Sequence, residues 1–105
     1  MRWEKKGELW NLYASSSMFY KDEALIASMK NDGSDTEYVW SCMNFREGTK
    51  EPDFPNRESA RGFISAPTLE GAKEVVETSI REELEEIIWD LNELKEQFTC
   101  WSFSN

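Results

Sequence analysis

The sequence predicts an α+β protein of one domain, in which three or four antiparallel strands pack against one long C-terminal helix. Three observations give this prediction. Short apolar-rich segments separated by turn signals fill the first part of the chain, residues 68–98 have helical periodicity, and 105 residues leave room for a single core. Charged residues make up 31% and aromatic residues 13% of the chain, a balance typical of a folded protein.

Residues 1–45 are expected to hold most of the strands. Three segments there are short and rich in apolar residues: Glu8–Ala14, Ala24–Lys30 and Thr36–Phe45. The segment Asn31–Asp35, which contains Gly33, lies between the last two and is a compact turn signal. It predicts a β-hairpin.

The third segment, Thr36–Phe45, has apolar residues on both of its faces. Side chains alternate along a strand, so Tyr38 and Trp40 point to one side while Val39 and Met43 point to the other. This pattern predicts a central strand, or a sheet covered by the helix on one face and by a partner or a tail on the other.

Residues 46–59 are polar, contain two prolines and have one large apolar residue, Phe54. They are expected to form a long surface loop, which is either a plain connection or a binding loop led by Phe54. Residues 60–67 then contain a fourth short strand, Arg61–Ala66. Arg57 and Arg61 are candidates to pair with carboxylates of the helix that follows.

Residues 68–98 are expected to form the helix, with Thr68 as the N-cap and acidic residues in the first turns, where the helix dipole favours negative charge. Apolar residues recur farther along at alternating spacings of four and three, which is a heptad pattern. Its members are Ile80, Leu84, Ile87, Leu91, Leu94 and Phe98.

A helix over residues 68–98 is too long for its domain. It measures about 46 Å at 1.5 Å per residue, whereas a globule of this size has a diameter of roughly 33 Å. The helix therefore either extends beyond the sheet and pairs with a second copy, or breaks near Thr78-Ser79. We expect extension and a homodimer formed through the heptad residues. The aromatic tail, residues 99–105, is expected to dock on the sheet as an extra strand or to remain an exposed peptide that binds a partner.

The helix also concentrates the negative charge of the chain. It has ten Asp or Glu residues against three Lys or Arg, and so holds seven of the nine net negative charges. One row of carboxylates runs along it at steps of about 5–6 Å, similar to successive phosphates of a nucleic acid. The row consists of Glu82, Glu86, Asp90 and Glu93. It is either an acidic surface that fits a groove lined by Lys and Arg, or an ordinary solvated helix face.

Trp89 lies on the helix side opposite the heptad residues, among carboxylates. If that side is exposed, Trp89 resembles a binding hot spot. The alternative is that the early strands or the aromatic tail cover and bury the ring.

Several functional classes are disfavoured. The chain has no histidine, no phosphate-binding glycine motif and only two separated cysteines, Cys42 and Cys100, so we expect no enzyme, metal or cofactor. A net charge of −9 disfavours direct binding of nucleic acid or anionic membranes. Without a signal peptide or an apolar run of about 20 residues, the expected location is the cytoplasm.

The segment Gly62–Lys73, with the sequence GFISAPTLEGAK, resembles the strand-to-helix junction of HicB-type antitoxin domains and is also similar to small phage and prophage proteins. The resemblance covers about Thr36 to Ile80. It implies a β-rich sheet with a helix across it, in an acidic protein that sequesters a small basic ribonuclease. The chain lacks the Pro-Gly-Cys step usual in that family and a C-terminal DNA-binding module.

Together these features predict a non-catalytic inhibitor or sequestering protein, encoded by a phage or mobile element. Its partner would be a basic protein, such as a nuclease or another nucleic-acid-binding protein, contacted by Trp89 and the acidic row. The alternatives are a HicB-like antitoxin that neutralises a small basic ribonuclease, or a structural protein that only oligomerises.

Overall fold

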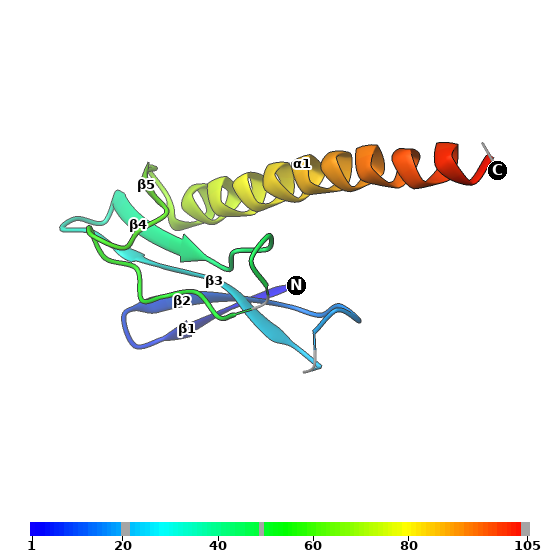
Figure 1. Cartoon of the computed structure of the whole chain (residues 1–105). Helices are drawn as coiled ribbons and strands as arrows, with labels where there is room; N and C mark the ends of the chain where they lie inside the picture. The colour runs from blue at the N-terminus through cyan, green and yellow to red at the C-terminus, as the bar shows by residue number, and fades with distance from the viewer. Residues whose placement is uncertain (20–21, 49, 104–105) are drawn as a thin grey trace.

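A computed structural model describes residues 1–19, 22–48 and 50–103; the side chains of residues 99–103 lie outside the description. It shows a five-stranded antiparallel sheet followed by one long helix (Figure 1), which confirms the α+β prediction. The strands follow in chain order, each paired with the next. They are β1 Arg2–Lys6, β2 Leu9–Ala14, β3 Ala24–Asn31, β4 Glu37–Cys42 and β5 Gly62–Ser65, and the helix is α1 Leu69–Phe103.

The sequence analysis missed one strand, β1, so three to four strands is too few. This strand has charged residues at four of its five positions and only one large apolar residue, Trp3, which gives a weak strand signal. It nevertheless pairs with β2 along its whole length, because Gly7 takes a positive φ of 60° and closes a tight hairpin turn. Charged residues suit an edge strand, since they discourage pairing with other chains.

The hydrophobic core lies between the sheet and the first half of α1. Leu12, Met29 and Trp40 come from the sheet, and they form one buried cluster with Val76 and Ile80 of the helix. The hairpin predicted between β3 and β4 is present, with Gly33 at a φ of 87° in its turn. Met43 also joins this core rather than facing away from Trp40, because β4 ends at Cys42 and the chain bends there.

The opposite face of the sheet is covered by the chain between β4 and β5 (Figure 1). The Ser41 hydroxyl donates a hydrogen bond to the carbonyl oxygen of Asp53, and Pro55 is fully buried. The Lys30 ammonium lies 4.8 Å from the centre of the Phe54 ring. The predicted loop is therefore packed against the sheet, and this accounts for the second apolar face of β4, where Val39 is fully buried.

Helix α1 begins where the sequence predicts, because the Thr68 hydroxyl accepts a hydrogen bond from the Gly71 amide at 3.1 Å. It does not break near Thr78-Ser79, and it runs on to Phe103. The prediction that the tail docks as a strand is therefore wrong for residues 99–103, while the alternative of an exposed aromatic peptide depends on side chains outside the described ones. Thirty-five helical residues span about 52 Å, and the molecule measures 61 × 27 × 24 Å.

Candidate functional site

Helix α1 extends beyond the end of the sheet (Figure 1). Its apolar stripe therefore begins in the core and continues into solvent. Ile80 is 8% exposed and belongs to the core of its own chain, so a second copy cannot use it; Leu84 packs against that core, and Ile87 is half-buried. Beyond them the same stripe is open. Its exposed members are Leu91 at 58%, Leu94 at 50% and Phe98 at 67%. The predicted self-association surface is thus divided, and only its distal part is accessible.

Trp89 lies on the other side of the helix and is 70% exposed. The described strands do not cover it, which excludes one of the two explanations that would bury this ring. Ile88 next to it is 56% exposed. Large apolar side chains this exposed on a helix rich in carboxylates are typical of binding surfaces.

The acidic row has two kinds of member. Glu82, Glu86 and Glu93 are exposed, and the structure gives them no ion pair within its described residues. Asp90 instead accepts a hydrogen bond from the Arg46 guanidinium at 2.6 Å, and both side chains are about half exposed. The hydrogen bond to Asp90 raises the pKa of Arg46. Three carboxylates of the row are therefore open to a partner and the fourth is held by the protein itself.

Arg61, which directly precedes β5, contacts both α1 and β4. Arg61 pairs with Glu83 at 2.5 Å, donates a hydrogen bond to the Cys42 sulfur at 2.8 Å, and lies 5.8 Å from the centre of the Trp40 ring. Burial lowers the pKa of Arg61, but the contact with the Glu83 carboxylate and the nearby Cys42 outweigh this and raise it. The prediction that Arg61 pairs with a helix carboxylate is confirmed.

On the other side of the core, β1 is tied to the helix. The Trp3 indole N–H donates a hydrogen bond to Glu77 at 2.9 Å, and the Lys73 ammonium lies 5.8 Å from the centre of the Trp3 ring. The prediction for Arg57 is wrong, because its guanidinium pairs with Asp32 of the β3–β4 turn at 3.0 Å. Sequence reasoning missed Trp3 and Arg46 as helix contacts, since both lie far from α1 in the chain.

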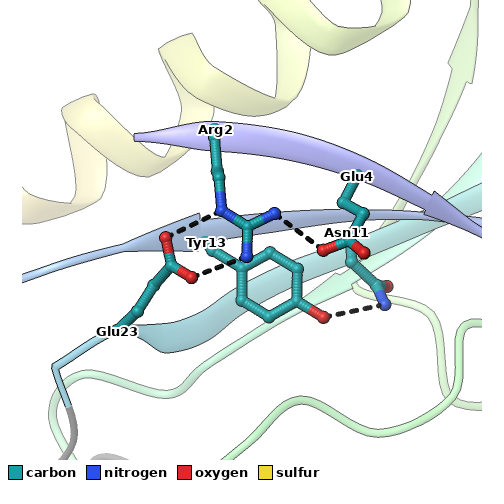
Figure 2. Close-up of polar contacts among 5 residues, drawn as sticks. All are labelled: Arg2, Glu4, Asn11, Tyr13 and Glu23. Atoms are coloured by element: carbon teal, nitrogen blue, oxygen red, sulfur yellow. Dashed lines mark hydrogen bonds and ion pairs between the residues drawn. The ribbon is translucent and has the colours of Figure 1, made fainter.

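The sheet face that points away from α1 has a charged cluster whose groups satisfy one another (Figure 2). Arg2 contacts Glu23 through two hydrogen bonds of 2.9 and 2.7 Å and Glu4 through a third of 2.7 Å, and these bonds raise its pKa. The Tyr13 ring lies 4.6 Å below the guanidinium, and its hydroxyl accepts a hydrogen bond from Asn11 at 3.5 Å. This cluster attaches the β2–β3 loop to β1 and leaves little net charge for a partner.

The described residues include one free cysteine beside a pocket. Among the described residues, no group of three or more His, Cys, Asp or Glu side chains could hold a metal ion. A pocket of about 330 Å³ opens beside the loop after β4, with Cys42 and Lys50 in its wall. Burial raises the pKa of the Cys42 thiol to about 11, although Arg61 opposes this, so the thiol is a poor nucleophile at neutral pH.

Comparisons with protein-family models, with curated proteins and with solved structures find no match for this chain. No helix formed by the described residues combines the length and the apolar character that crossing a lipid bilayer requires. The distal half of α1 exposes Trp89, most of the acidic row and the outer part of the apolar stripe.

Proposed function

We propose that the chain is a non-catalytic protein-interaction module that binds the basic face of another protein through the distal half of α1. The observation that carries this proposal is the position of Glu82, Glu86 and Glu93. Their carboxylates are exposed beside an exposed Trp89, and the helix that bears them extends beyond the sheet.

The charge distribution supports such a partner. Three helix carboxylates, those of Glu77, Glu83 and Asp90, are engaged by Trp3, Arg61 and Arg46. Glu82, Glu86 and Glu93 are exposed to solvent on the side of the helix that bears Trp89. A helix side with one sign of charge steers an oppositely charged protein toward it and speeds their association. Trp89 adds a large apolar anchor at the centre of that side.

The partner that fits best is a nucleic-acid-binding protein or a nuclease with a groove lined by Lys and Arg. Glu82, Glu86 and Glu93 follow the axis at intervals of about 6 and 10 Å, so they can meet cations that normally contact phosphates. The part of α1 that bears these carboxylates extends beyond the sheet (Figure 1), so this helix side can lie against such a groove. Occupying that groove would inhibit the partner.

One local feature supports a HicB-like antitoxin within this class. Strand β5 leads through Ala66 and Pro67 to the N-cap Thr68, which is the strand-to-helix junction that the resemblance concerns. In that case the partner is a small basic ribonuclease. If the chain is a HicB-like antitoxin, adding it is expected to abolish the activity of this ribonuclease. Unchanged ribonuclease activity would exclude the antitoxin alternative.

The test is capture of binding proteins from a bacterial lysate at low and high salt, with two variants of equal charge. In the first, Glu82, Glu86 and Glu93 are replaced by Gln. In the matched control, three exposed carboxylates of the sheet and its loops are replaced by Gln or Asn. The control positions are Glu8, Asp35 and Glu58.

Wild type and control are expected to retain the same basic protein at low salt and to release it at high salt, because salt screens the attraction between the exposed carboxylates and the cations of the partner. The helix variant is expected to lose it at both. Trp89→Ala is expected to weaken capture by tenfold or more, the loss of an interface hot spot. Equal retention by the two charge variants would refute the proposal.

A further inference from the structure

The exposed apolar stripe formed by Leu91, Leu94 and Phe98 has no partner within the described chain. We propose that a second copy of the chain covers this stripe, with the two projecting helices packed side by side and antiparallel. This inference does not rest on the proposed function, because the stripe lies on the side of α1 opposite Trp89.

The sheet decides the direction of the pairing. It lies on the same side of α1 as the stripe and covers this side up to about Leu84. In a parallel pair both sheets would lie at the N-terminal end of the pair, in the space between the two helices, and would overlap. In an antiparallel pair they lie at opposite ends, and each projecting helix fills the space beside the other, up to the edge of its sheet.

The heptad pattern gives the register. Antiparallel packing that keeps the stripe continuous places Leu91 opposite Leu94 of the second copy and brings Phe98 next to Ile87 of that copy. The flanking positions then pair Asp90 with Gln97, and Ile88 with the aliphatic part of Lys95. No two like charges meet at the seam, although the helix has a strong net negative charge.

The remaining carboxylates stay out of the interface. Glu82, Glu86 and Glu93 lie on the outer sides of the pair, as does Trp89. A chain of net charge −9 can therefore self-associate without bringing its most acidic surfaces together. The dimer also displays two copies of the acidic surface, so a partner with two binding sites would be bound more tightly by avidity.

The exposed area predicts how tight this dimer is. An aliphatic side chain offers on the order of 100 Å² and a Phe about 150–250 Å² of apolar surface. At their exposed fractions in the structure, Ile88 and the stripe supply roughly 300 Å² per copy. Two copies and their flanking residues then bury about 1,000 Å², the lower end for a specific interface. The dimer is expected to be weak and dependent on concentration.

Sedimentation equilibrium between about 5 and 500 μM tests the interface. The mass is expected to rise from 12.3 kDa toward twice that value. The double variant Leu91→Glu/Leu94→Glu is expected to stay monomeric. Val75→Glu, a control at a position that is 43% exposed outside the stripe, is expected to dimerise like the wild type. Circular dichroism confirms that the variants fold. A wild type that stays monomeric throughout, or a double variant that still dimerises, would overturn the proposal.

A distance measurement tests the direction. A spin label on Arg81→Cys, in a Cys100→Ser background, marks the point where α1 leaves the sheet, and Cys42 reacts little there because burial raises its thiol pKa to about 11. The proposed register places the two labels about 35 Å apart along the helix axis. A parallel pair would bring them to roughly the interaxial distance of 8–10 Å plus the label lengths. A short distance would refute the antiparallel arrangement.

Discussion

The contact between Arg61 and Glu83 is expected to contribute more to stability than an ordinary surface ion pair. We choose Arg61→Met as the perturbation, because methionine keeps much of the apolar stem but removes the guanidinium. This group contacts Glu83 at 2.5 Å and Cys42 at 2.8 Å and lies over Trp40. The Glu83 side chain is only 17% exposed, and its oxygen in this contact is shielded from solvent.

The magnitude follows from the groups left behind. Leaving the buried Glu83 oxygen without its cation costs about 1–3 kcal/mol, and losing the contact with Trp40 costs about 0.5–1 kcal/mol. Because the Arg61 side chain is 37% exposed, solvent screening reduces the total. The expected loss is about 2–3 kcal/mol of unfolding free energy, which lowers Tm by roughly 8–24 °C in a domain of this size.

Urea unfolding of four proteins measures this loss: wild type, Arg61→Met, Glu83→Gln and the double variant. The cycle isolates the coupling between the two side chains, expected at about 1–2 kcal/mol. Arg61→Lys is a useful companion, since an ammonium cannot reproduce the several contacts of the guanidinium. A loss below about 0.5 kcal/mol for Arg61→Met, or additive single variants, would show that solvent compensates both groups and that the reasoning is wrong.

Two further predictions concern Trp40 and Cys42, the neighbours of Arg61. Gly62→Ala is expected to lower the free energy of unfolding in urea by about 1–3 kcal/mol, because the added methyl group would lie 2.8 Å from the Trp40 indole nitrogen and force the ring to move. Gly48→Ala is the control: its methyl group meets nothing within 4 Å, but Gly48 has a positive φ, so this variant measures backbone strain without the steric effect. Burial raises the pKa of the Cys42 thiol from 9.0 to about 11, so alkylation by iodoacetamide at pH 8 in a Cys100→Ser background is expected to be about 100-fold slower than in the urea-unfolded chain. Between about pH 9 and pH 11 the unfolded chain releases this proton and the folded chain keeps it, so the thiol makes folding less stable as pH rises. Equal alkylation rates in the two states would contradict the burial of this thiol.

Much of the fold could be predicted because its signals are local. The turn around Gly33 and the alternation in β4 give the central hairpin, and Thr68 gives the start of α1. The length of the segment with helical periodicity also predicts a helix that is longer than its domain. Strand β1 gave only a weak signal, because four of its five residues are charged and its one large apolar residue, Trp3, contacts the distant Glu77 of α1.

The end of α1 shows why composition can mislead. The aromatic residues after Phe98 favoured a strand, but no glycine or proline follows Phe98 to stop the helix. Helix continuation was therefore the simpler expectation.

The candidate site could be predicted only in outline. Periodicity placed Trp89 opposite the apolar stripe, and its exposure agrees with that placement. Periodicity could not show that Ile80 belongs to the core while Leu91 is in solvent, because this depends on where the sheet ends. It also could not show that Asp90 is held by Arg46, which is 44 residues away in the chain.

The central claim is that the distal half of α1 is the surface that a partner contacts. Amide hydrogen exchange of the chain, alone and with the basic protein that it captures, tests this claim most directly. In the complex, exchange is expected to slow over residues 82–98 and to stay unchanged in the loop at 50–60. Slower exchange confined to that loop or to β1, with α1 unaffected, would contradict the account and move the binding surface to the sheet.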